Sequence, residues 1–283
     1  MNTKAIILSL SLIIGLLFLA NAQQIQMPQA SPSAKISQKI GLTDVTVDYS
    51  RPSMKGRKIF GELVPYGDVW RTGANAGTVI SFSTDVKIEG RDLPAGTYAI
   101  YSIPGKDEWT MIISSNTKLW GAVGYDSADD VLRFKVKPGK TSQKYETMEI
   151  NFADMTDTGA SVAIKWENTR VKFRIETEVD SIVMAQIKEM VIDKDPQNPG
   201  LYYQAANYYY TNNKGFIQAY EWIKKSVDED PKYWTVHLKA KIELALGLRK
   251  EAIESAKKSM EMAKEAKNPD YVSLNERLIK SIK

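Results

Sequence analysis

The stretch Thr97–Ser114, TYAIYSIPGKDEWTMIIS, contains two short runs rich in aromatic and β-branched residues. Residues 97–103 and 109–114 have the length, period and composition of half-buried strands. Between them, residues 104–107 (PGKD) supply the proline and glycine that favour a tight turn. The stretch therefore predicts two consecutive strands joined by a turn, which is a unit of antiparallel structure.

The same pattern extends in both directions along the first two thirds of the chain. Further strands are predicted at 45–49, 79–83, 86–90, 131–137, 145–152, 161–166 and 170–176, with turns at 89–92, 94–96, 138–140, 157–159 and 167–168. No helical pattern of ten to fifteen residues interrupts them, which argues against parallel βαβ units. We predict an all-β antiparallel sandwich, jelly-roll-like, over residues 31–179.

The hydrophobic period changes from two to about 3.6 at Ser181. From there the sequence reads as helices interrupted at DKDPQNPG, TNNKG, DEDPKY, LGLRK and AKNPDY, which predicts an all-α domain over residues 180–283. The tyrosines in this domain have two possible roles: they pack between helices, or they bind a partner helix. These are Tyr202, Tyr203, Tyr208, Tyr209 and Tyr210.

A weak repeat runs through the helical domain. Ala219 and Ala252 are 33 residues apart, and so are Ser226 and Ser259. With Tyr210 and Pro231, these residues resemble the 34-residue unit of tetratricopeptide repeats, in which small residues lie where paired helices touch. Asn207 stands where that unit has a small glycine. The resemblance implies a tetratricopeptide-like architecture and a surface for a protein partner.

The first 22 residues have the features of a secretory signal peptide. Lys4 precedes an apolar run, and Ala20-Asn21-Ala22 forms an Ala-x-Ala cleavage site. The alternative is an uncleaved anchor, since residues 5–20 fall just short of a membrane span. We predict cleavage near Ala22, a short segment at 23–30, no later membrane span, and a periplasmic or secreted protein.

The residue inventory restricts the chemistry. The chain has no cysteine and one histidine, His237 in the helical half, so the sandwich cannot hold a Ser-His-Asp triad, a cysteine nucleophile or a zinc site with His or Cys ligands. The net charge of +4 is too small to indicate a nucleic-acid partner. The sequence contains no phosphate loop or dinucleotide motif, so no cofactor is predicted. Catalytic and metal-ligating residues are therefore not assigned.

Two groups of aspartates leave alternatives open. They are Asp126, Asp129 and Asp130 in GYDSADD, and Asp154 and Asp157 in ADMTDTG. Solvated turns, a calcium loop or a pair of catalytic carboxylates would each use such residues.

The arginines are distributed unevenly: seven of nine lie in the β half. Three of these fall in the non-periodic stretch 50–75, where aromatic and amide side chains accompany them. Arginine holds carboxylate or phosphate with a planar fork, so the stretch is a candidate small-ligand or glycan site; alternatively, the same residues hold the loop together. The candidate binding residues are Arg51, Arg57, Tyr66, Trp70, Arg71 and Asn75.

Several motifs in the β half resemble a known family. They are Ser50-Arg51-Pro52, Gly56-Arg57, Pro65-Tyr66-Gly67, residues 70–75 (WRTGAN), residues 94–98 (PAGTY) and Ile103-Pro104-Gly105. In this order they resemble domain of unknown function 2911, a family of exported bacterial proteins, over residues 31–179. The resemblance implies a single β domain and brings no activity, ligand or catalytic residue.

Together these observations predict an exported cell-envelope protein that binds a small molecule or glycan through the sandwich and a protein partner through the helices. Two alternatives remain: a carboxylate-dependent hydrolase acting on glycans, and a purely structural envelope protein.

Overall fold

A computed structural model describes residues 27–282 of the chain. The predicted signal peptide, its cleavage site and residues 23–26 lie outside the described residues. The chain divides into two compact units between Glu178 and Val179, and each unit is described by itself. Among the described residues, no helix combines the length and the apolar character that a membrane crossing requires.

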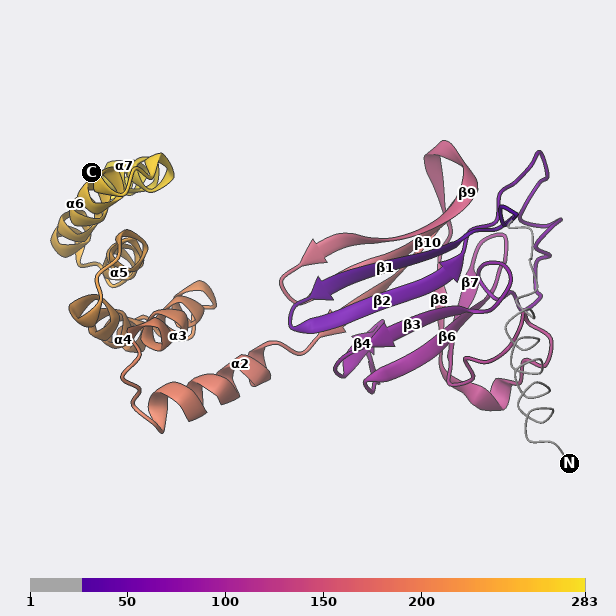
Figure 1. The fold of residues 1–283 in the computed structure, drawn as a ribbon, viewed down its shortest axis with the longest axis horizontal. Coiled ribbons are helices and arrows are strands. Elements are labelled where there is room, and N and C mark those ends of the chain that lie inside the picture. The colour runs from indigo at the N-terminus through magenta and orange to yellow at the C-terminus, as the bar shows by residue number, and fades with distance from the viewer. Residues whose placement is uncertain (1–26, 283) are drawn as a thin grey trace, which may run out of the picture. The chain divides into compact units, whose positions relative to one another are not determined.

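The first unit is built from two antiparallel sheets (Figure 1). The six-stranded sheet has the order β1-β2-β3-β6-β7-β8 and the four-stranded sheet the order β5-β4-β10-β9. The strands of the first are β1 Ser33–Ile40, β2 Thr43–Ser50, β3 Thr78–Phe82, β6 Gly96–Ile103, β7 Trp109–Ser114 and β8 Asp130–Val136. Those of the second are β4 Val86–Ile88, β5 Arg91–Leu93, β9 Gly139–Thr156 and β10 Gly159–Thr177, and a short 3₁₀ helix, Ser127–Asp129, precedes β8.

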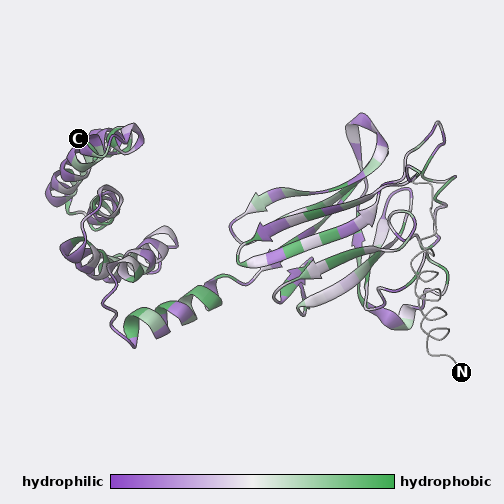
Figure 2. Cartoon of the chain, in the orientation of Figure 1, coloured by the Kyte–Doolittle hydropathy of each residue, from purple (hydrophilic) through white to green (hydrophobic). Residues whose placement is uncertain are grey.

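Alternation along the strands places the core between the two sheets. In β2, Val45, Val47 and Tyr49 are buried, and the residues between them are more exposed. Figure 2 shows this alternation as differently coloured bands along the strands. The Tyr49 hydroxyl also joins the sheets, because it donates to the Ile150 carbonyl at 3.2 Å and accepts from the Ile150 amide at 3.0 Å. The predicted sandwich is therefore confirmed.

Four aromatic rings close one end of the core. Trp109 comes from the six-stranded sheet and Trp166 from the four-stranded sheet, whereas Phe60 and Trp70 come from the non-periodic segment between β2 and β3. Trp70 stacks on Trp166, with ring centroids 5.9 Å apart and planes 21° apart. Phe60 meets Trp109 edge to face at 4.9 Å. This aromatic cluster ties the non-periodic segment to both sheets.

The strand predictions differ from the structure in several places, and one is that β9 begins at Gly139, inside the turn predicted at 138–140. Strand β1 was not predicted, because SAKISQKI contains only three apolar residues. Arg91–Leu93, predicted within a turn, forms the short strand β5. The turn predicted at 167–168 is wrong: β10 continues through it, and the pairing with β9 shifts register on both sides of Glu167, whose φ is 55°. A β-bulge absorbs these turn-favouring residues without ending the strand.

The second unit is helical, and its breaks fall where the sequence predicts them. Its helices are α2 Asp180–Ile187, α3 Pro199–Thr211, α4 Phe216–Glu229, α5 Tyr233–Ala245, α6 Arg249–Glu265 and α7 Pro269–Ile282, with a π-helical turn at Lys188–Ile192 (Figure 1). Helix α3 begins where Asn198 accepts from the Gly200 amide and Pro199 occupies the first turn. Each of the helices α3 to α6 packs on the next one along the chain.

The repeated small residues lie at the contacts between helices. Ala219, Ser226, Ala252 and Ser259 are all buried. Of the tyrosines, Tyr202 is buried, and the other four are partly buried against the helical core. The structure thus places these tyrosines in interhelix packing, whereas the tetratricopeptide resemblance stays a prediction.

His237 belongs to a polar network inside the helical unit. Its Nδ1 lies 2.7 Å from the Asn275 amide oxygen, and the Asn275 amide nitrogen donates to the Ser259 hydroxyl at 2.8 Å. Ser259 in turn donates to the Tyr233 carbonyl at 2.6 Å. The network links α5, α6 and α7, so His237 has a packing role.

The aromatic cluster predicts a large difference between two tryptophan variants. Trp166→Ala removes a buried ring that contacts Phe60 and Trp70, so we expect the β unit to lose about 3–5 kcal/mol of unfolding free energy. Trp120→Ala, at a residue that is 72% exposed, should change it by less than about 0.5 kcal/mol. Urea unfolding followed by circular dichroism measures both. Equal losses would show that the cluster does not carry the core.

The histidine network predicts a pH-dependent stability. Burial lowers the pKa of His237, the hydrogen bond from its ring to the Asn275 amide oxygen opposes this, and the charge of Lys241 adds to the lowering. The unfolded chain therefore takes up the proton first as the pH falls below about 6.5. We expect the helical unit to lose stability below that pH, by at most about 1.4 kcal/mol per pH unit from this residue. Thermal unfolding of His237→Gln should lack this component, and identical pH profiles would contradict the assignment.

Candidate functional site

Two of the six predicted binding residues hold the loop. Arg51 Nε donates to the Met148 carbonyl at 2.9 Å. Arg57 donates from Nε to the Met54 carbonyl at 2.8 Å and from Nη2 to the Ser53 carbonyl at 2.7 Å. Both guanidinium groups thus satisfy backbone oxygens of a segment that has few ladder bonds of its own.

Asn75 and Tyr66 also make contacts within the protein. The Asn75 side-chain amide donates to the Ser31 carbonyl at 3.1 Å, and the residue adopts a left-handed φ of 59°, which asparagine tolerates. The ring of Tyr66 lies against Gly61, where a side chain would collide with it, and 40% of the residue is exposed. These two residues shape the loop surface around the remaining pair.

Trp70 and Arg71 point to opposite faces of the six-stranded sheet. The Trp70 amide donates to the Ser102 carbonyl at 2.7 Å, and the Ser102 amide donates to the Trp70 carbonyl at 2.8 Å, so the loop continues the ladder along β6 beyond the end of β3. Trp70 turns inward into the aromatic cluster. Because strand residues alternate in direction, Arg71 faces outward, on the same side as Tyr101.

Arg71 and Tyr101 each have a buried polar atom without a hydrogen-bond partner. Within the described part of the chain, neither the Arg71 Nε nor the Tyr101 hydroxyl has a partner, although Tyr101 is completely buried. Arg71 forms no ion pair with any described residue. A buried donor left unpaired costs roughly 1–3 kcal/mol. Both atoms are closed to solvent, so an external acceptor reaches them only if the neighbouring side chains move.

A second loop, residues 115–126, meets Arg71 on this outer face. The Gly77 amide donates to the Leu119 carbonyl at 3.3 Å, and Ala76 pairs with Trp120. Gly121, with a φ of 86°, lies against Arg71 Nη1, and a Cβ there would collide with it. Trp120 is 72% exposed. Arg71 therefore lies beside a glycine that leaves room for its guanidinium, and the residue before that glycine is the exposed Trp120.

Sequence reasoning did not identify Tyr101 or Trp120. Tyr101 sits in a predicted strand, where it reads as an ordinary core residue. Trp120 could have been found from the sequence. The segment LWGAVGY at 119–125 has two glycines among apolar residues and shows neither a strand nor a helical period, which indicates a loop. The combination resembles the composition of the 50–75 stretch.

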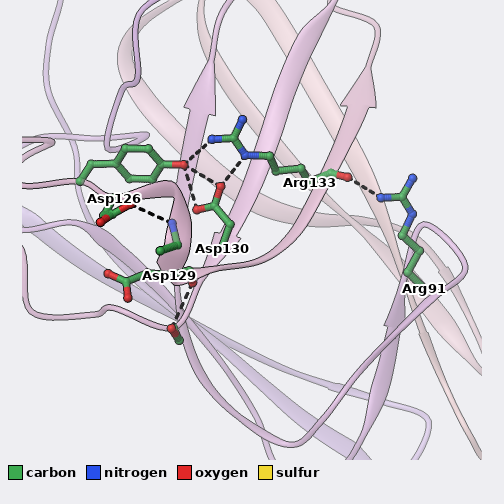
Figure 3. A network of polar contacts seen from close by, with 8 residues as sticks. Arg91, Asp126, Asp129, Asp130 and Arg133 are labelled. Carbon is green, nitrogen blue, oxygen red and sulfur yellow. Dashed lines mark hydrogen bonds and ion pairs between the residues drawn. The ribbon is translucent and has the colours of Figure 1, made fainter.

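A polar network continues from this point across the sheet. The Tyr101 and Tyr125 rings lie 5.2 Å apart, and the Tyr125 hydroxyl donates to Asp130 Oδ2 at 2.7 Å. Arg133 donates from Nη2 to the Tyr125 hydroxyl at 2.6 Å and from Nε to Asp130 (Figure 3). Arg71, Tyr101, Tyr125, Asp130 and Arg133 are called the Arg–Tyr cluster below.

Strand register explains why the cluster forms. Tyr101 pairs with Ile112 and Ile112 with Arg133, which sets these residues in one row on the outer face. Between Ile113 and Ser114 the pairing with β8 shifts by one residue, so Val131 of β8 has no pairing partner on β7. This bulge turns Asp130 to the same face as Arg133, within ion-pair distance.

The sequence-predicted aspartates have structural partners nearby. Asp126 caps the 3₁₀ helix by accepting from the Ala128 amide at 2.9 Å (Figure 3). Asp129 accepts from the Asn116 amide at 3.0 Å. Asp154 pairs with Lys172 at 2.6 Å. Within residues 27–282, no three acidic, histidine or cysteine side chains gather as a metal site. The carboxylates thus act in turns and ion pairs.

The tyrosines of the cluster are neutral hydrogen-bonding groups. Burial raises the pKa of the Tyr101 hydroxyl, the charge of Arg71 lowers it, and that of Asp129 raises it. Burial likewise raises the pKa of Tyr125, with a further rise from its hydrogen bond to Asp130. Neither tyrosine is a base at neutral pH, so the cluster is suited to hold a ligand by hydrogen bonds and charge.

Comparison with known proteins gives one match. A family model described as protein of unknown function (DUF2911) matches residues 31–175. Neither the curated proteins nor the solved structures include a match to the chain.

Two glycines in the second loop give a matched test of the contact with Arg71. Gly121 and Gly124 have φ values of 86° and 79°, so alanine at either position costs roughly 1–2 kcal/mol of backbone strain. Only at Gly121 would the new methyl group also collide with Arg71; at Gly124 the nearest atom is 3.7 Å away. We expect Gly121→Ala to be the less stable variant in urea unfolding.

The same two glycine variants can also be compared through an NMR signal of Arg71 itself. The Arg71 Nε–H resonance, assigned by its loss in Arg71→Lys, should shift in Gly121→Ala and remain in place in Gly124→Ala. A shift of equal size in both variants would show that the loop as a whole, rather than the contact, determines the position of Arg71.

Proposed function

The chain belongs to the DUF2911 family, whose description assigns no activity, and we propose from its own residues that it is a binding protein whose ligand carries an anionic group. The observation that supports this is the pair of buried, unpartnered polar atoms, Arg71 Nε and the Tyr101 hydroxyl. A carboxylate accepts from both types of donor, and arginine binds it with a planar fork. Arg71 and Tyr101 hold the anionic group in this proposal.

The neighbouring side chains favour an acidic sugar among possible anions. Trp120 presents an exposed indole one residue from Gly121, which Arg71 contacts. An indole offers a broad apolar face with a polar edge, which suits a ring that is apolar on its face and polar at its rim. The ligand proposed is therefore a carboxylate-bearing sugar or glycan, with its ring on Trp120.

The binding function is preferred over catalysis because the carboxylates near the cluster are engaged. Asp130 pairs with Arg133, and Asp129 accepts from Asn116. A glycosidase needs one carboxylic acid and one free carboxylate on either side of the scissile bond. A purely structural role accounts for Arg51 and Arg57, which donate to carbonyl groups, but leaves Arg71 unexplained.

The location and the partner belong to the same proposal. An exported envelope protein, cleaved near Ala22, would meet acidic glycans outside the cytoplasm. The helical unit, with its repeated small residues buried between helices, would present a tetratricopeptide-like surface to a protein partner.

A thermal-shift screen of the mature protein tests the proposal. The probes are uronic-acid oligosaccharides, neutral oligosaccharides, simple carboxylates and inorganic phosphate. We expect acidic sugars to raise the Tm of the β unit and Arg71→Ala to abolish that rise, because the charged partner is lost. Tyr101→Phe should weaken binding by about 3- to 10-fold without loss of stability, since its hydroxyl has no partner among the described residues.

Arg57→Ala is the matched control, because it removes an exposed arginine that contacts only nearby carbonyl groups. It should retain the full ligand-induced rise in Tm. The proposal fails if neutral and acidic sugars act equally, or if Arg71→Ala retains binding. A large loss of Tm in unliganded Arg71→Ala would instead assign the residue a structural role.

A further inference from the structure

A groove of about 580 Å³ lies along strand β8, and its lining includes one residue of the neighbouring strand β7. It is lined by Glu89, Arg91, Thr110, Arg133, Phe134 and Lys135. Strands β8 and β5 are edge strands of the two sheets, and the lining residues Arg133 and Arg91 belong to them. The groove therefore lies where both ladders end, and it is separate from Arg71 and Tyr101.

The main chain of β8 has hydrogen-bonding groups directed to this groove. Arg133 pairs through its strand with Ile112 of β7 on one side, and on the other its carbonyl accepts from Arg91 Nη1 (Figure 3). Because the hydrogen-bonding direction of an antiparallel strand repeats every two residues, the main-chain amide and carbonyl of Lys135 point to the same side as those of Arg133. A side chain from β5 thus occupies a position that a neighbouring strand would take, as in protected sheet edges.

The side chains around this edge differ between the two faces of β8. Arg133 and Lys135 are exposed on the outer face, whereas Phe134 is buried on the inner face. Arg133 is paired with Asp130 and also donates to the Tyr125 hydroxyl, whereas Arg91 adds a cation that forms no ion pair with any described residue. Lys135 pairs with Glu108 at 2.9 Å, with both side chains about half exposed, so exchange of that partner is inexpensive.

We propose that the groove binds an extended peptide segment that pairs with the edge of β8 opposite β7. Alternation dictates the chemistry of this segment: acidic residues on the face of Arg133 and Lys135, and apolar residues on the face of Phe134. The Arg91 guanidinium leaves the Arg133 carbonyl and pairs with an acidic side chain of the peptide. This is binding by strand addition, in which main-chain bonds supply affinity and alternate side chains supply specificity.

The probe is a fluorescent eight-residue peptide of alternating glutamate and valine, and its binding to the mature protein is measured by anisotropy. Lys135→Gln removes one charge and should weaken binding by about 2- to 5-fold. Lys135→Pro removes the same charge and also the amide donor, so it should weaken binding by about a further 3- to 10-fold. An edge strand tolerates proline where the amide faces outward, and circular dichroism checks that both variants are folded.

A peptide of the same sequence with methylated backbone amides is the second control, because it retains the charges and loses the ladder bonds. We expect it to bind at least about 10-fold more weakly. The proposal is overturned if the methylated peptide or polygalacturonate binds as tightly as the probe, if Lys135→Pro matches Lys135→Gln, or if the probe does not bind. Arg71→Ala should leave peptide binding unchanged, which separates this site from the proposed sugar site.

Discussion

The stacking of Trp70 on Trp166 fixes the position of the loop that carries Arg71. Trp166 lies on the four-stranded sheet, Trp109 on the six-stranded sheet, and Trp70 on a segment with little regular structure of its own. Three large rings brought together at one end of the core leave the segment one position. The residue after Trp70 then has a defined direction, and that residue is Arg71.

This constraint places the side chains of Trp70 and Arg71 in different environments. The Trp70 main chain pairs with Ser102 as a strand residue does, so one side chain enters the core and the next reaches the outer face. Trp70 has the structural role, and Arg71 is presented to Tyr101 and Gly121. Trp70 and Arg71 therefore place a core ring and an outward-facing guanidinium at consecutive positions.

The sandwich and the helix breaks could be predicted because they depend on local period and turn chemistry. Strand β7 was predicted with its observed bounds, and the Asp-Pro and Asn-Pro breaks ended helices as expected. What could not be predicted depends on pairing between distant strands. The bulge at Val131 that brings Asp130 to Arg133, and the bridge between Ala76 and Trp120, follow from register, which no single segment encodes.

The concentration of arginine in the β unit has more than one cause. Arg51, Arg57, Arg91 and Arg174 each donate to a backbone carbonyl in a loop, a bulge or an edge strand, where ladder partners are missing. A sandwich with long connections and four sheet edges needs such donors, and lysine lacks the planar fork that reaches two oxygens. Arg133 is paired with Asp130. Composition alone therefore cannot distinguish a binding arginine from a structural one. The distinguishing property is an unpaired guanidinium beside a second unpaired donor, and among the described residues Arg71 with Tyr101 has it.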